Sequence, residues 1–186
     1  MSPHDLPAGA ALLAHGQRLA QPSAAFAGDH GDPDPTVRAA IAAAQDQVGY
    51  LRALAALCTS RLLMPIVAHG DESMDGPDPN RHAEMAAVKL AGPDGSQALL
   101  AFTGIDSLQA WQRQARPVPC TLDDLAATVA ESGASHLLLD VAGPVPYELG
   151  PELVAELAQG HRLVEVAPGE FGWMYLAEQG QDDQQR

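Results

Sequence analysis

The sequence predicts an α+β fold in which helices flank a mixed β-sheet that contains a β-hairpin. Three observations lead to this class. Segments with helical periodicity alternate irregularly with short apolar strands, two apolar runs flank the turn sequence GPDG at residues 92–95, and the strand HLLLD is apolar on both faces. Because a regular parallel fold would need strands and helices in strict alternation, a layer of helices on a mixed sheet is the better prediction.

The first half of the chain predicts two helices and then a strand. Good helix formers fill residues 36–46 behind Pro35, with Thr36 as the expected N-cap. A second helix follows, whose expected buried face consists of Val48, Leu51, Leu54, Leu57 and Cys58. RLLMPIV, residues 61–67, then predicts a strand. Because Pro65 cannot donate to a ladder, we expect this strand at a sheet edge or with a bulge.

The clearest local signal is EMAAVKLAGPDGSQALLAF, residues 84–102, which predicts a β-hairpin. Proline stands where a type I turn favours it, and glycine follows shortly after. The next segment, GIDSLQAW, predicts a short helix with Asp106 as its cap and with Leu108 and Trp111 on one side. The following RPVP is expected to end that helix.

The second half begins with a helix that Thr121 caps and Gly133 ends. Its expected buried stripe consists of Leu122, Leu125, Ala126 and Val129. HLLLD and VPYEL predict two strands, and a helix is expected between Pro151 and Gly160. RLVEV and WMYL predict a last pair of strands.

Composition and charge bound the organisation and the partners. Residues 1–33 predict a disordered or loosely packed leader, residues 34–178 one domain, and residues 179–186 a disordered tail. The chain has 24 acidic and 10 basic residues, and its basic residues do not cluster, so we expect no nucleic acid and no membrane as partner. AGAALLA is too short for a membrane span and follows no Lys or Arg, which favours a cytoplasmic protein. A protein partner or a homo-oligomer is expected instead.

Several segments together resemble a known family. FAGDHGDPDP, RLLMPIVA, MAAVKLAGPDGSQALLAFTGIDSLQAW, RPVP and LLLDVAGPVPYEL are similar, in order and spacing, to the SseB family N-terminal domain in its actinobacterial form. The similarity covers roughly residues 26–160. It implies a small α+β domain without an agreed catalytic residue or cofactor. The family is named for enhanced serine sensitivity, and the same name is attached to a secreted translocon component of type III secretion.

The segment HGDESMDGPDPNRHAE, residues 69–84, concentrates groups that could bind a metal. A metal-dependent hydrolase would use His69, Asp71, Glu72, His82 and Glu84. However, thirteen positions separate the two histidines, and glycines and prolines lie between them. Ordering this segment around one ion would cost about 1 kcal/mol of backbone entropy per residue. The sequence therefore predicts a solvated connection and no tightly bound metal.

Asp140 and Cys120 are two further candidates for a chemical role. Asp140 ends an apolar strand, where phosphotransfer enzymes place a nucleophilic carboxylate, but DVAGP lacks the second acidic residue that would bind magnesium. A structural role for Asp140, such as capping the turn at Gly143, is predicted. Cys120 precedes a helix, and we expect it to pack on Leu125 as a hydrophobic staple rather than to act as a thiolate.

The resulting hypothesis is a non-enzymatic protein-interaction or regulatory module, with no catalytic residue, metal ligand or cofactor assigned. Its expected interaction surface consists of Phe102, Thr103, Trp111, Pro144, Pro146 and Tyr147. Two alternatives stay open. One is the metal-dependent hydrolase, and the other is a secretion-related substrate or chaperone, which only the family name suggests.

Overall fold

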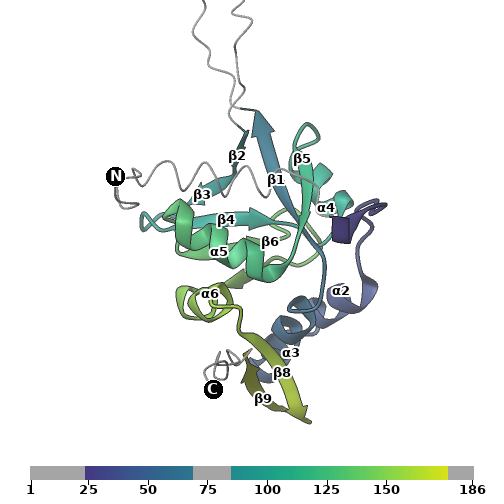
Figure 1. The fold of residues 1–186 in the computed structure, drawn as a ribbon, viewed down its shortest axis with the longest axis vertical. Helices are drawn as coiled ribbons and strands as arrows, with labels where there is room; N and C mark the ends of the chain where they lie inside the picture. Colours follow the sequence, from purple (N-terminus) through teal and green to yellow (C-terminus); the bar gives the residue numbers. More distant parts are fainter. Residues whose placement is uncertain (1–23, 69–84, 176–186) are drawn as a thin grey trace, which may run out of the picture.

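The computed structural model describes residues 24–68 and 85–175. In chain order the elements are η1 (Ala24–Phe26), α2 (Pro35–Ala42), α3 (Gln47–Leu57), β1 (Leu62–Ala68), β2 (Met85–Ala87), β3 (Lys89–Ala91), β4 (Gln97–Ala101), α4 (Ile105–Trp111), β5 (Arg116–Cys120), α5 (Leu122–Ser132), β6 (His136–Leu139), β7 (Tyr147–Leu149), α6 (Pro151–Ala158), β8 (Arg162–Ala167) and β9 (Glu170–Met174). Their arrangement is shown in Figure 1. The fold is α+β, as the sequence predicts.

The described strands form three small sheets, and backbone hydrogen bonds join the first two. One has the order β2-β1-β5 and is antiparallel; the second has the order β3-β4-β6-β7, in which only β4 and β6 are parallel; β8 and β9 form a third. Leu63 and Phe102 exchange backbone hydrogen bonds of 2.8 and 2.9 Å, and the Leu100 amide donates to the Val88 carbonyl. These bonds join the first two sheets side by side.

The predicted hairpin is confirmed, but its first apolar run serves two sheets. β3 pairs with β4 across the turn, where the Gly95 amide donates to the Gly92 carbonyl and Gly95 has a φ of +85°. The residues just before β3 belong instead to β2, which pairs with β1. The chain therefore passes from one sheet to the other at Val88.

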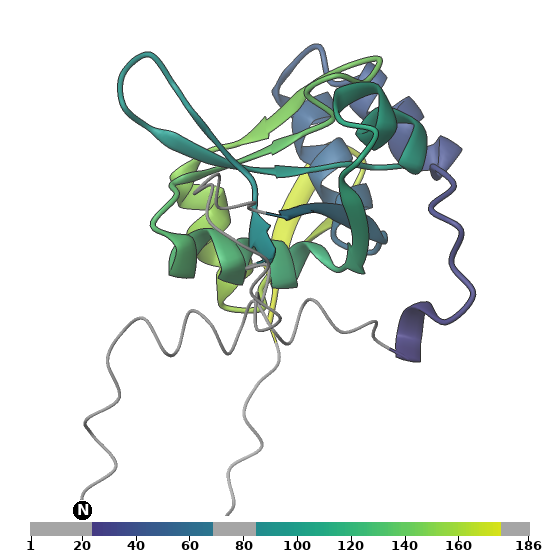
Figure 2. The same ribbon diagram turned by 90° about the horizontal axis from the view of Figure 1, so that it is seen from above.

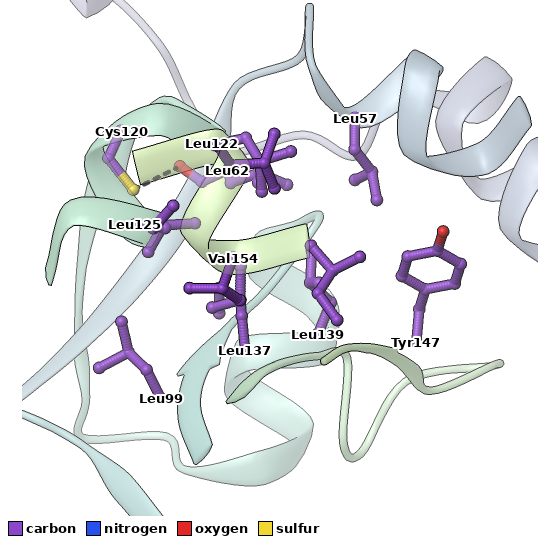
Figure 3. Close-up of a cluster of buried hydrophobic side chains, with 14 of the residues drawn as sticks. Leu57, Leu62, Leu99, Cys120, Leu122, Leu125, Leu137, Leu139, Tyr147 and Val154 are labelled. Atoms are coloured by element: carbon purple, nitrogen blue, oxygen red, sulfur yellow. Dashed lines mark hydrogen bonds between the residues drawn. The ribbon is translucent and has the colours of Figure 1, made fainter. Parts of the chain in front are cut away.

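The main core lies between the four-stranded sheet and its helices. Leu99 on β4 and Leu137 on β6 are fully buried and point toward α5 and α6, as Figure 3 shows for the packed side chains of this layer. Figure 2 shows α5 and α6 on one side of this sheet, whereas α4 lies beyond the other side at one end. One face of the sheet is thus covered along its length, and the other only in part.

Helix ends follow the predicted signals in the second half of the chain and depart from them in the first. Thr121 and Asp124 form a complete capping box on α5, and Gly133 ends that helix with a φ of +73°. In contrast, Asp34 caps α2 by accepting from the Thr36 amide at 2.8 Å, so the prediction of Thr36 as N-cap was wrong. Gly104 precedes α4, and no side chain caps it.

The prediction for β1 needs correction. β1 is the central strand of its sheet, so the edge position expected from Pro65 was wrong. The Leu63 amide donates to Phe102 and so points away from β5. Backbone direction alternates along a strand, so the Pro65 nitrogen, two residues later, points away from β5 as well. On that side of β1, Leu63 pairs with Phe102 and the pairing with β2 begins only at Ile66. Pro65 therefore has no strand partner there, and its missing N–H costs no hydrogen bond between strands. The RPVP segment, which was expected to end α4, belongs to β5, opposite β1.

The segment before α2 is attached to the domain. The Ile105 amide donates to the Gly31 carbonyl at 2.8 Å, the Arg61 side chain forms an ion pair with Asp29 at 2.6 Å, and Arg61 also donates to the Asp32 carbonyl. Gly31 is buried and has a φ of +81°. Contacts with the domain therefore begin before residue 34, where the sequence predicted the domain to start.

Gly31→Ala should destabilise the protein more than Gly28→Ala. Both glycines have positive φ values, but a Cβ at Gly31 would lie 3.1 Å from the Ile105 Cβ, whereas a Cβ at Gly28 meets nothing within 4 Å. The left-handed conformation costs each alanine about 1–2 kcal/mol, so only the difference reports on the attachment. We expect a larger loss of unfolding free energy for Gly31→Ala in urea denaturation. Equal losses would show that this segment does not pack tightly on α4.

The β8–β9 hairpin rests on α3 through one face. Leu163 is buried, and the half-buried Phe171 and Trp173 pack against the main core. Arg52 on α3 donates two hydrogen bonds, of 2.9 and 2.5 Å, to the Glu165 carboxylate. The predicted last pair of strands is present, but the second strand, β9, begins three residues before the predicted WMYL segment. An exposed ion pair marks the contact of the hairpin with α3.

The ion pair predicts the titration of Glu165. The hydrogen bond from Arg52, helped by one from the Gly169 amide, lowers the pKa of Glu165 from 4.5 to about 2. Since the folded pKa is the lower one, this pair stabilises the fold above about pH 4.5, and its contribution is lost as the pH falls toward 2. Arg52→Gln should return the pKa of Glu165 most of the way to its ordinary value in a carboxyl-detected NMR titration. An unchanged pKa in the variant would refute the pairing.

Candidate functional site

Buried polar side chains meet where the two parallel strands end. β4 and β6 run in parallel, so the residues after them lie at the same edge of the sheet. Thr103 and Ser107 follow β4, and Asp140 follows β6; their exposed fractions are 2%, 3% and 2%. We call these three residues together with Arg38 the Asp140 cluster.

The Asp140 carboxylate accepts hydrogen bonds from the segment after β4. The Thr103 amide donates to Oδ1 at 2.9 Å, the Thr103 hydroxyl donates to Oδ2 at 2.5 Å, and the Ser107 hydroxyl lies 2.6 Å from Oδ1. A carboxylate with three such donors is well compensated for its burial. Asp140 thereby binds the end of β6 to the start of α4.

The backbone at Asp140 is unusual as well. Its φ of +51° lies in the left-handed region, which aspartate tolerates better than most residues. The Asp140 carbonyl accepts from the Gly143 amide at 2.8 Å, and a Cβ at Gly143 would lie 2.7 Å from the Asp140 Cβ. The turn at Gly143 is therefore closed by the Asp140 backbone. The predicted structural role fits, but the side chain caps no turn, because it is engaged with Thr103 and Ser107.

Arg38 extends the cluster to α2. Its Nε donates to the Thr103 hydroxyl oxygen at 3.0 Å, and its two terminal nitrogens donate to both carboxylate oxygens of Asp106, each at 2.6 Å. These bonds lower the pKa of Asp106 and raise the pKa of Arg38. The sequence prediction of Asp106 as a helix cap was wrong, because this carboxylate pairs with Arg38 instead.

The hydrogen bonds of the Asp140 cluster connect separate elements of the fold and leave no reactive group open to a substrate. The protons of Thr103 and Ser107 are directed to a carboxylate, but all three side chains are almost wholly buried, so a substrate atom has no access to them. The bonds join α2, the start of α4 and the end of β6. Sequence reasoning noticed Asp140 and missed its partners, because only the parallel pairing of β4 and β6 brings them together.

The two cysteines are buried and free. Burial raises the pKa of both thiols, most of all that of Cys120. Cys120 and Leu125 belong to the same core cluster, and the Cys120 Sγ lies 3.7 Å from the Leu62 carbonyl oxygen (Figure 3). This arrangement agrees with the predicted packing role and leaves little thiolate at neutral pH.

The predicted interaction surface is only partly at the surface. Phe102, Thr103 and Tyr147 are buried, with exposed fractions of 0%, 2% and 4%, so they cannot form a contact surface. The Phe102 ring packs beside the half-buried Trp111, at 5.6 Å between ring centroids, whereas Pro144 and Pro146 are exposed. Tyr147 is covered by α3, because its ring stacks on Tyr50 of that helix and its hydroxyl donates to the Tyr50 carbonyl at 2.7 Å.

A different surface emerges on the partly covered face of the four-stranded sheet. Its buried base consists of Leu63, Leu100, Phe102, Leu108 and Ala115. Around this base lie apolar side chains that remain partly accessible, and we call them the open face: Val67, Val88, Leu90, Trp111, Leu138 and Val141. Leu90 belongs with them because it pairs with Ala98, which shares its face of the sheet with Leu100, and Leu100 pairs with Leu138.

The metal hypothesis concerns residues outside the described ones, since His69, Asp71, Glu72, His82 and Glu84 all lie between residues 68 and 85. Within residues 24–68 and 85–175 no group of three or more His, Cys, Asp or Glu side chains could hold a metal ion. Across the same ranges, no helix is long and apolar enough to cross a membrane.

Asp140→Asn should lower the free energy of unfolding by about 2–3 kcal/mol, because the amide cannot accept all three hydrogen bonds in the buried cluster. Asparagine also tolerates a positive φ, so this change isolates the loss of the carboxylate from backbone strain. Asp106→Asn is the matched control, since that side chain is 55% exposed and should cost less than about 1 kcal/mol. Urea denaturation of both variants measures the difference. Similar losses of unfolding free energy would contradict the stabilising role of the Asp140 carboxylate.

The family model of the SseB protein N-terminal domain matches residues 37–156, which include the Asp140 cluster and the open face and end within α6. No curated protein and no solved structure matches the chain. With most of its length matched by this model, the chain belongs to the SseB family.

Proposed function

We propose that this SseB domain is a non-catalytic binding module, and that its open face docks an apolar segment of another protein. The observation that carries the proposal is the partial burial of the open face. Soluble proteins rarely leave contiguous apolar side chains accessible without a binding role. Here these side chains come from β1, the β2–β3 junction, β3, α4, β6 and the turn after β6, and they surround one buried base.

The border of the open face supports the same proposal. Beyond Leu138, the sheet carries Glu148 on β7 and His136 on β6, whose side chains approach to 3.8 Å. Interfaces commonly have an apolar centre and a polar rim of this kind. The Asp140 cluster supplies rigidity, because it fixes α4, from which Trp111 reaches the open face.

The experiment compares two substitutions with the same chemistry. Leu90 is 38% exposed on the open face, and Val166 is 66% exposed on the β8–β9 hairpin, away from it. In cells that express the full chain, Leu90→Glu should reduce chemical crosslinking to the partner at least about tenfold, since a buried charge at an interface costs well over 1 kcal/mol. Val166→Glu should leave the crosslinked partner unchanged.

Both variants must melt within a few degrees of the unmodified protein, which their exposure predicts. The proposal fails if Leu90→Glu retains every crosslinked partner that Val166→Glu retains. It also fails if the purified protein converts a substrate in a reaction that Leu90→Glu leaves intact.

A further inference from the structure

The edges of the described sheets are protected in different ways. Pro117 and Pro119 on β5 lie opposite Pro65 and Leu63, which direct their backbone groups away from β5. Antiparallel partners share this alternation, so both prolines place their missing N–H groups on the free side of β5. Proline at an edge prevents the addition of another strand.

The remaining edges of the first two sheets are protected as well. On β7, the Tyr50 hydroxyl from α3 donates to the Glu148 carbonyl at 2.7 Å. β2 and β3 have only three residues each, and β3 begins with a lysine. Short strands and edge lysines both disfavour pairing with another chain.

β9 lacks these protections. It has five residues, EFGWM, with no proline, no lysine and no irregularity except at the turn, and α3 contacts the hairpin through β8. Its two aromatic side chains, Phe171 and Trp173, are only half-buried. On the opposite face of the hairpin, Val166 and Met174 are 66% and 54% exposed.

We propose that β9 pairs with β9 of a second copy of this chain, so that two hairpins form one four-stranded antiparallel sheet. This inference is independent of the open face and of the function proposed for it. The hairpin lies beyond residue 156, where the match to the family ends. Figure 1 shows it at one extremity of the molecule, so a second copy can approach it without crossing the main sheets.

The sequence of β9 favours self-pairing about its central residue, Gly172. In that register Phe171 lies opposite the second copy's Trp173, which covers two half-buried rings at once. Glu170, the only charged residue of β9, lies opposite the second copy's Met174 and not opposite another carboxylate. Self-pairing therefore brings no like charges face to face within the new ladder.

The rest of the chain sets the strength of this association. Two strands bury much less surface than a standard protein interface, so the dimer is weak and dependent on concentration. Each copy carries a formal charge of -14. Because salt screens the repulsion between the two copies, the dissociation constant should fall as the salt concentration rises.

The test is sedimentation equilibrium of the full chain over micromolar to millimolar concentrations, at low and high salt. Met174→Glu places a carboxylate opposite Glu170 of the second copy, and the symmetry of the dimer repeats this contact at both ends of the shared ladder. The repulsion should raise the dissociation constant roughly tenfold. Met174→Lys should leave it unchanged or lower it. Val166→Glu adds the same charge to the hairpin away from the edge, and it should have less effect than Met174→Glu.

A charge exchange tests the register itself. Combining Met174→Glu with Glu170→Lys places opposite charges face to face, and it should restore dimerisation to within a few-fold of the unmodified protein. A protein that stays monomeric at every concentration and salt would overturn the proposal. So would an equal effect of Met174→Glu and Val166→Glu, or a double variant as weak as Met174→Glu alone.

Discussion

The burial of one carboxylate, that of Asp140, constrains much of this fold. β4 and β6 can pair in parallel only if the chain after each strand leaves the sheet at the same edge, and this brings Thr103 and Asp140 together. The carboxylate must then be compensated, which the Thr103 and Ser107 donors achieve. Because these donors lie at the start of α4, compensation also determines where α4 lies and therefore which part of the sheet it covers.

That placement explains the unequal faces of the four-stranded sheet. α5 and α6 cover one face with a continuous layer of leucine and valine side chains. α4 has only seven residues and is held at the carboxyl end of the strands, where Phe102 and Leu100 are covered. Leu138, beside Leu100 on β6, and Leu90, nearer the other end of the strands, remain partly accessible. The open face is thus a geometric consequence of a short helix fixed by a buried charge.

Local signals were enough to predict most elements of the fold. The Thr121 cap, Gly133 and the GPDG turn act through bonds to residues a few positions away, so their outcome depends little on tertiary structure. Pro65 and Asp106 were misread for the opposite reason. The place of Pro65 depends on where β2 and Phe102 meet β1, and the partner of Asp106 is an arginine 68 positions away. Such partners are brought together by the topology of the whole fold, which cannot be predicted from neighbouring residues alone.

The candidate site was less predictable than the fold. Asp140 stood out because phosphotransfer enzymes place a nucleophilic carboxylate at the end of an apolar strand, but no pattern in the sequence links it to Thr103, Ser107 or Arg38. Phe102 and Tyr147 were included in the predicted interaction surface because they belong to the segments AFTGIDSLQAW and AGPVPYEL. Both are buried, because Phe102 packs beside Trp111 on α4 and Tyr147 stacks on Tyr50 of α3, contacts between distant parts of the chain.

The reciprocal bonds between α3 and β7 have a consequence for the kinetics of folding. The Tyr50 hydroxyl binds the Glu148 carbonyl and the Tyr147 hydroxyl binds the Tyr50 carbonyl, across sequence separations of 98 and 97 residues. Closing so long a loop costs only modestly more entropy than closing a shorter one, because the cost grows with the logarithm of loop length. The search for these contacts is nevertheless slow, since folding rates fall as the mean separation of contacting residues rises. The β3–β4 hairpin can form from neighbouring residues, whereas α3 reaches its final position only when β7 is in place.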